Sequence, residues 1–269
     1  MFDFNILSII AGIPGLLIAM VIHEYAHAQV ADWMGDDTPR LMGRLTLNPV
    51  AHIDPVGLIM LLVAQFGWAK PVTIQVGNFR NWRKGEICVS LAGPVSNLIT
   101  AFVALVIEVI FVKLHLFTTT ALPMVLHLIV LYNVNFAIFN MIPLPPLDGS
   151  RVLMCFLPTS WNYKLASLER YSFLILIALM MTPFFTYILI PLQRLVFALF
   201  SLILTLLNAL HLYLLVPVQR HKLFDVLLHT AIGVPFLAEE LHRNVVPAVR
   251  VPLRDAQLVG QMVTVQLHF

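Results

Sequence analysis

The chain has 269 residues, of which 59% are hydrophobic and only 11% carry a charged side chain. The mean hydropathy of +0.89 excludes an ordinary soluble globular protein, because a soluble domain of this length cannot bury so large an apolar fraction. The formal charge of +2 is too small to argue for nucleic acid as a partner, and Cys88 and Cys155 show no ligand spacing. The composition therefore indicates a multi-pass membrane protein without a disulfide framework.

The first apolar segment, residues 7–33, contains the most informative motif of the chain. Residues 23–27 read HEYAH, an instance of H-E-x-x-H. Side chains four residues apart share one face of a helix, so His23 and His27 can bind one Zn²⁺ with Glu24 beside them as general base. Ionisable groups are costly at membrane depth, which favours a functional role over two structural histidines. No basic residue precedes the apolar run as in a signal peptide, so we expect a retained span.

The region between the first and second long apolar segments predicts a small β element. Residues 44–48 and 71–76 alternate apolar and polar side chains, which is typical of short strands that could pair. Such strands could receive an extended substrate at an edge, or simply cover the site as a hairpin. Residues 56–66 form an apolar run too short to cross about 30 Å of hydrocarbon, which favours a re-entrant or buried half-helix.

Further apolar segments follow. A long span is predicted at 87–113, interrupted at 92–97, and a return span at 121–142. Stretches 172–181 and 187–215 supply one or two more spans. We therefore expect an all-α multi-pass bundle of about five to six segments with a small membrane-associated β element.

The distribution of basic residues orients these spans. Lysine and arginine cluster at 80–84, 151–170 and 220–222, whereas the link at 114–120 carries only a histidine. The positive-inside rule places all three clusters on the cytoplasmic side. The end of the return span then lies at the same depth as the HEYAH motif, so Asp148 is expected to meet the two histidines.

Asp148 can complete a catalytic zinc site, which takes three protein ligands and an open position. It follows a proline-rich stretch at the end of an apolar span, where irregular backbone is tolerated only if it is buried in protein or lines a cavity. An ordinary Asp-Gly turn at a membrane boundary is the alternative reading of this residue.

These motifs, in this order, resemble the site-2 protease family of intramembrane zinc metalloproteases. The resemblance covers residues 7–155 and rests on HEYAH at 23–27, GPVSN at 93–97 and NMIPLPPLDG at 140–149. Residues 48–55, NPVAHIDP, are similar to the compact prokaryotic branch that lacks an inserted PDZ domain.

The resemblance implies one Zn²⁺ per chain, held by His23, His27 and Asp148, with Glu24 polarising the attacking water. It places Asn97 and Asn140 near the reacting carbonyl, although hydrogen bonding between helices is an alternative role for both. The implied activity is zinc-dependent cleavage of transmembrane segments in membrane-protein substrates, as in regulated intramembrane proteolysis.

The resemblance also sets expectations for organisation. Residues 1–215 are expected to form the protease domain in the lipid bilayer of a prokaryotic cell membrane, with the active site toward the cytoplasm. Residues 216–269 are expected to form a cytoplasmic or membrane-surface tail.

Two other functions are left open. One is a non-catalytic zinc-binding membrane scaffold that binds substrate helices, and the presence of Glu24 argues against it. The other is a metal or ion transporter, although the sequence shows neither internal repeats nor a second coordinating cluster.

Weaker site candidates are His52, Asp54 and Glu108. The first two could orient a metal ligand or belong to an interface turn. Glu108 could face the outer interface or pair locally.

Overall fold

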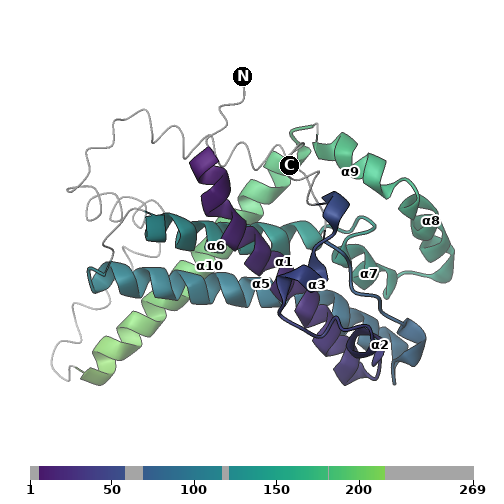
Figure 1. The fold of residues 1–269 in the computed structure, drawn as a ribbon, viewed down its shortest axis with the longest axis horizontal. Helices are drawn as coiled ribbons and strands as arrows, with labels where there is room; N and C mark the ends of the chain where they lie inside the picture. The colour runs from purple at the N-terminus through teal and green to yellow at the C-terminus, as the bar shows by residue number, and fades with distance from the viewer. Residues whose placement is uncertain (1–5, 58–68, 117–120, 181, 216–269) are drawn as a thin grey trace. The chain divides into compact units, whose positions relative to one another are not determined.

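The computed structural model describes residues 6–57, 69–116, 121–180 and 182–215, and statements about structure concern these residues (Figure 1). Within them, four helices are long and apolar enough to cross a membrane. They are α1 (Ile6–Met34), α5 (Trp82–Lys113), α6 (Ala121–Asn140) and α10 (Phe184–Leu215). The predicted all-α membrane class is confirmed for this part of the chain.

Shorter helices connect the long ones. The helix α9 (Ser172–Met180) has nine residues and is only about 14 Å long, too short to cross a bilayer. The predicted count of five to six segments is not confirmed, because four described helices are long enough to cross and the predicted half-helix at 56–66 lies almost entirely outside the described residues. The remaining short helices are α2 (Thr38–Leu41), α3 (Pro49–His52), η1 (Val76–Asn78), α7 (Asp148–Met154) and α8 (Thr159–Glu169).

The chain divides into a first unit over residues 1–185 and a second unit from Thr186 onward. In the first unit, α1, α5 and α6 pack against one another pairwise, and α7 packs against α5. The second unit contains most of α10, a helix that continues through Pro191.

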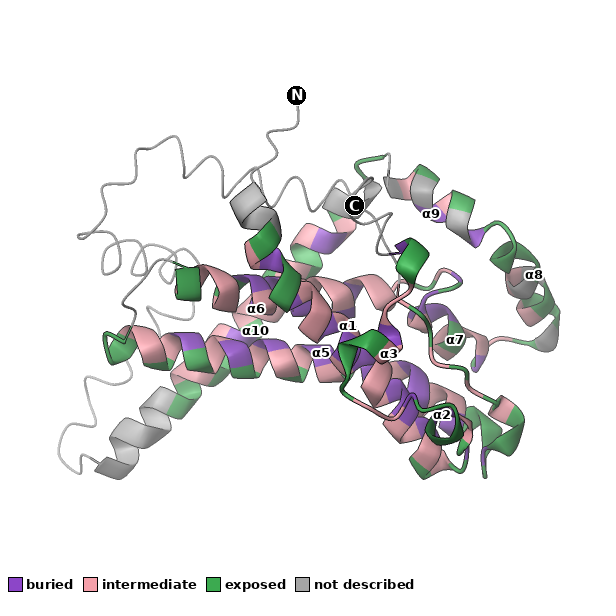
Figure 2. Ribbon diagram, in the orientation of Figure 1, coloured by how far each residue is buried: buried purple, intermediate pink, exposed green. Residues whose placement is uncertain are grey.

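Small and polar side chains line the contacts among α1, α5 and α6. The buried face of α5 includes Gly93, Asn97, Ala101 and Ala104, and Figure 2 shows buried residues recurring along α5 and α6. Small residues allow close approach of helices in lipid, where the hydrophobic effect does not drive association between helices. The opposite face of α5 exposes apolar side chains suited to lipid, such as Ile99 and Val103.

The predicted interruption of α5 at residues 92–97 is wrong, because the helix runs continuously through Pro94. Proline removes only one backbone donor, and helices packed among neighbouring helices in a membrane tolerate this loss. The Ser96 hydroxyl donates to the Gly93 carbonyl at 2.7 Å, and the Thr100 hydroxyl donates to the Ser96 carbonyl at 2.8 Å.

The predicted strands at 44–48 and 71–76 are also wrong, since residues 44–48 and 71–75 have irregular backbone and Val76 begins η1. Two N–H groups of the second segment bind carboxylates instead of a neighbouring strand. Val72 donates to Glu24 Oε2 at 3.0 Å, and Gln75 donates to Asp36 Oδ2 at 2.7 Å. In the described ranges, the strand-like pairing is one isolated antiparallel bridge between Ile53 and Ala69.

Asp36 holds the segment around Gln75 and Asn78 close to the end of α1. Its buried carboxylate accepts hydrogen bonds from the Thr38 backbone, the Asn78 amide and the Gln75 backbone. Burial alone would raise the pKa of Asp36, but the Thr38 hydroxyl, which also donates to this carboxylate, and these donors outweigh burial and hold the pKa below its ordinary value.

Candidate metal centre

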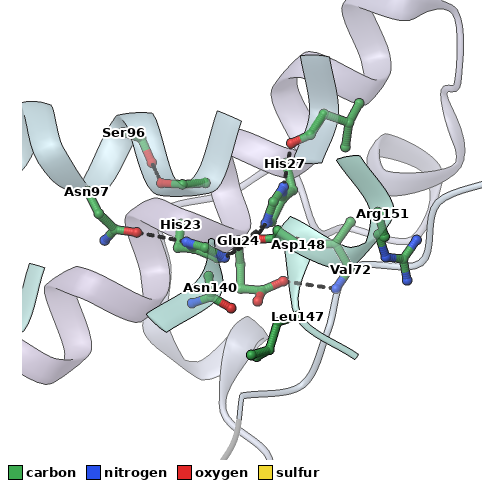
Figure 3. A network of polar contacts seen from close by, with 12 residues as sticks. His23, Glu24, His27, Val72, Ser96, Asn97, Asn140, Leu147, Asp148 and Arg151 are labelled. Atoms are coloured by element: carbon green, nitrogen blue, oxygen red, sulfur yellow. Dashed lines mark hydrogen bonds and ion pairs between the residues drawn. The ribbon is translucent and has the colours of Figure 1, made fainter. Parts of the chain in front are cut away.

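Three side chains from two elements converge beside α5. His23 and His27 lie one turn apart on α1, and Asp148 is the first residue of α7, after the irregular stretch that follows α6. Figure 3 shows the three side chains pointing toward one another. The two histidines are only 3% and 6% exposed, so the imidazoles are enclosed by protein.

The separations among the three side chains suit a tetrahedral metal ion. The two Nε2 atoms are 2.9 Å apart, and Asp148 Oδ2 lies 3.1 Å from His23 Nε2 and 3.2 Å from His27 Nε2. Ligand atoms around a tetrahedral zinc lie roughly 3.3 Å apart, because each bond is about 2.0–2.1 Å long. Two imidazoles and one carboxylate also form a donor set typical of catalytic zinc. The residues present therefore fit Zn²⁺.

The second ring nitrogen of each histidine has an acceptor. His27 Nδ1 lies 2.8 Å from the Val89 carbonyl, and His23 Nδ1 lies 2.7 Å from Asn97 Oδ1. A carbonyl can only accept, so Nδ1 of His27 carries the proton. The lone pair of Nε2 is then free for a metal, which is the arrangement usual in metal-binding histidines.

The Asp148 carboxylate is largely buried beside the two imidazoles, with 14% of its side chain exposed. An ionised carboxylate is the form that binds a cation.

Two contacts hold α7, and with it Asp148, in place. A Cβ added to Gly149 would collide with the Met141 backbone, so glycine permits the close approach of these segments. Arg151 of α7 forms an ion pair with Glu86 of α5 at 3.5 Å.

Gly93 creates the space for the two imidazoles. A Cβ placed on this residue of α5 would lie 2.5 Å from His23 Cε1 and 2.6 Å from His27 Nε2. Such distances are far below van der Waals contact, so any side chain at this position would displace the histidines.

Glu24 belongs to the same polar network. Its Oε2 atom accepts the hydrogen bond from the Val72 backbone, which comes from the irregular segment before η1 (Figure 3). This contact fixes the orientation of a carboxylate that directly follows His23 in the sequence.

Comparison with known proteins identifies the family. The model of Peptidase family M50 matches residues 110–183, a range that includes Asp148 but not the histidine pair. The chain is 39% identical over 180 residues to YwhC of Bacillus subtilis, a match that covers 65% of this chain and 82% of YwhC. The chain belongs to peptidase family M50. This is the site-2 protease family of zinc metalloproteases, which the motifs resemble.

Other relatives of this M50 chain are more distant. Rip2 of Mycolicibacterium smegmatis is 32% identical over 178 residues, covering 64% of this chain and 66% of Rip2. Rip2 of Mycobacterium tuberculosis strain H37Rv is 30% identical over 176 residues, with the same coverage of each chain. The names of all three relatives refer to zinc metalloproteases. No solved structure matches the chain.

The asparagines of the M50 chain occupy different environments. Asn97 is fully buried on α5 and contacts the imidazole of His23. Asn140 is the last residue of α6, and its amide donates to the Phe136 carbonyl at 2.9 Å. The predicted hydrogen bonding between helices is therefore observed for Asn97, whereas the amide of Asn140 contacts a carbonyl of its own helix.

The weaker candidates form contacts away from the three converging side chains. His52 is fully buried, with Nε2 2.8 Å from the Thr46 carbonyl, and Asp54 accepts from the Val56 and Gly57 backbone. Glu108 does not face the outer interface, because it is only 4% exposed and lies 3.9 Å from His127.

Sequence reasoning assigned no role to Gly93, Val89 or Val72. Gly93 was part of a recognised motif, but its function depends on which side chains pack against it. Val89 and Val72 act through backbone atoms, so their residue types give no signal.

Proposed function

We propose that this M50 protein is an intramembrane endopeptidase that cleaves peptide bonds within or near transmembrane segments of membrane-protein substrates. One Zn²⁺ per chain would be held by His23, His27 and Asp148. The observation that carries the proposal is the triangle of ligand atoms with sides of 2.9, 3.1 and 3.2 Å, built on helices apolar enough to span a bilayer. The family membership supports the metal and the reaction type.

When bound, zinc supplies a Lewis acid that polarises the scissile carbonyl and makes water acidic enough to react near neutral pH. The protein supplies the proton transfers. Glu24 accepts a proton from the attacking water and returns it to the leaving amine. The Val72 N–H holds one oxygen of the Glu24 carboxylate, which keeps the base oriented between turnovers.

The two asparagines have separate roles in this proposal. Asn97 orients His23 through its 2.7 Å contact with Nδ1. Asn140 is the candidate donor to the negative charge that develops on the substrate oxygen. An amide nitrogen carries two hydrogens, and the contact with Phe136 uses one of them.

We place the site near the cytoplasmic face of the cell membrane. Arg83 and Lys84 lie in the first turn of α5, about 9 Å along the helix axis from Val89, which contacts His27. The positive-inside rule favours the cytoplasmic side for this end of the helix. The proposed partners are transmembrane protein substrates and the surrounding lipid, and regulated intramembrane proteolysis is the proposed biological setting.

The test compares the purified wild-type protein with Glu24→Gln. Bound zinc is counted by mass spectrometry of the metal, and cleavage of model transmembrane helices is followed in detergent and in vesicles. We expect one zinc per chain in both proteins and a cleavage rate at least about 100-fold lower in Glu24→Gln. Equal turnover by both proteins would reject Glu24 as the base. Zinc binding without cleavage of any membrane helix by the wild type would favour a scaffold.

A further inference from the structure

Asn133 of α6 extends the hydrogen-bonded network behind His23. It is fully buried, and its Oδ1 atom accepts a hydrogen bond from Asn97 Nδ2 at 2.9 Å. Its own Nδ2 donates to the Ile129 carbonyl at 2.8 Å. A continuous chain of contacts therefore joins α6 to α5 and then to the imidazole of His23 on α1.

Backbone carbonyls fix the orientation of the two amide groups in this network. The Ile129 carbonyl can only accept, so it draws the Nδ2 end of Asn133 toward itself and turns Oδ1 toward Asn97. Asn97 then donates one hydrogen to Asn133 and the other to the Ala19 carbonyl at 2.8 Å. With both hydrogens of Asn97 committed, only its oxygen can face His23.

The orientation of the Asn97 amide decides which ring nitrogen of His23 carries the proton. An oxygen facing Nδ1 requires the proton on Nδ1, so Nε2 is the ring atom that faces Asp148 and His27 and would bind the metal. A reversed Asn97 amide would present N–H to Nδ1 and favour a proton on Nε2, where it would block metal binding. Reversal would also bring the Asn97 oxygen against two acceptors, Ala19 O and Asn133 Oδ1. Asn133 therefore supplies one of the two restraints against reversal.

We propose that Asn133 is a positioning residue that holds His23 in its metal-binding tautomer by fixing the orientation of the Asn97 amide. The apolar neighbour Val134 is equally buried, so a change there tests packing without touching the hydrogen bonds of Asn133. The low dielectric of the bundle interior strengthens the effect, since a misdirected amide there has no water to compensate it.

The experiment uses the full-length protein in detergent, with two readouts and a matched control. The first readout is the tautomer of His23 in zinc-free protein, from ¹⁵N magnetic resonance of labelled histidine, with His23→Gln assigning the signals. The second is zinc affinity by competition with a chromophoric chelator. Asn133→Leu removes both hydrogen bonds at similar volume, Asn133→Ala does so with a smaller side chain, and Val134→Ala perturbs packing alone.

We expect a proton on Nδ1 of His23 in the wild type and in Val134→Ala, and loss of this proton from part of the population in either Asn133 variant. Zinc affinity should fall about tenfold in the Asn133 variants. This is the lower end of the loss seen when residues that support metal ligands through hydrogen bonds are removed. In an Asn97→Leu background, Asn133→Leu should cause no further loss, because the pathway through Asn97 is already broken.

An unchanged protonation of His23 Nδ1 in both Asn133 variants would overturn the proposal. The proposal would also fail if Asn133→Leu lowered zinc affinity as much in the Asn97→Leu background as it does in the wild type. Because the inference rests on the proposed zinc role of His23, the two failures must be separable. Failure of the wild type to bind zinc would reject the proposed function, while the tautomer measured without zinc would still decide the role of Asn133.

Discussion

The buried face of α5 carries two polar regions that differ in how their atoms are satisfied. At Asn97, the amide oxygen and both amide hydrogens have partners on α1 and α6. At Glu108, three turns further along, Oε2 is buried and has no hydrogen-bond partner among the described residues, and the nearest histidine nitrogen is 3.9 Å from the other oxygen. In lipid, a satisfied network fixes geometry, whereas an unsatisfied carboxyl costs stability. The first region is therefore suited to holding a metal ligand.

The largest effect is expected from removing Asp148 of α7, a metal ligand that lies beside the first region. Removing a residue that hydrogen-bonds to a metal ligand typically lowers metal affinity roughly 10- to 100-fold. Asp148→Ala should lower zinc affinity by more than this, because it removes a ligand itself. Cleavage should fall at least to the level of Glu24→Gln. Chelator competition measures the affinity, and cleavage of the model transmembrane helices measures the activity.

His127→Ala serves as the control in the second region. It should leave zinc affinity within about twofold of the wild type, because distant sites act independently. Loss of zinc in this variant would show that the two regions are coupled.

The next largest effect is expected from filling the space in front of the imidazoles. Gly93→Ala should abolish tight zinc binding and lower the free energy of unfolding by about 1–3 kcal/mol, since the new methyl group overlaps both rings. Gly77→Ala is the matched control, because a Cβ at Gly77 meets nothing within 4 Å. Equal stability and metal content in both variants would mean that α5 can move away from α1 at no cost.

A gain in stability is expected from the second region. Glu108→Leu replaces a buried unpaired oxygen with an apolar group and should raise the free energy of unfolding by about 1 kcal/mol. Zinc affinity should stay unchanged. Unfolding in detergent, followed by circular dichroism, measures the stability. A destabilised variant that also loses zinc would make Glu108 part of the functional site and would contradict the comparison.

The smallest effect is expected outside the membrane, at Asp36. Its lowered pKa means that the carboxylate stabilises the fold above the ordinary aspartate pKa, and that this stabilisation is lost as pH falls through the lowered value. Asp36→Asn should therefore be less stable than the wild type near neutral pH, with the difference shrinking in acid. Unfolding curves at several pH values give this dependence. A difference that grows in acid would contradict the assignment.

The site could be predicted where its signal is a spacing or a position relative to the membrane. The four-residue interval between His23 and His27 fixes a shared helix face, and the charge pattern brought Asp148 to the same depth. Gly93 and Asn133 could not be assigned in this way, because their roles depend on the atoms that pack against them across α1, α5 and α6.

The fold could be predicted where apolar length decides the outcome. Bounds of the long helices follow from hydrophobicity, but alternation at residues 71–76 does not reveal which acceptor each N–H will find. Val72 and Gln75 bind carboxylates of Glu24 and Asp36, so no strand forms there. Pro94 alone does not reveal that α1 and α6 pack against α5 and that the helix continues through this residue.

X-ray absorption of the zinc-loaded protein tests the central claim most directly, because it reports the atoms that surround the metal. The structure predicts two imidazole nitrogens and carboxylate oxygen at about 2.0–2.2 Å, with the imidazole contribution falling by half in His27→Ala. A sulfur ligand, or an imidazole contribution that is unchanged in His27→Ala, would contradict the proposed centre.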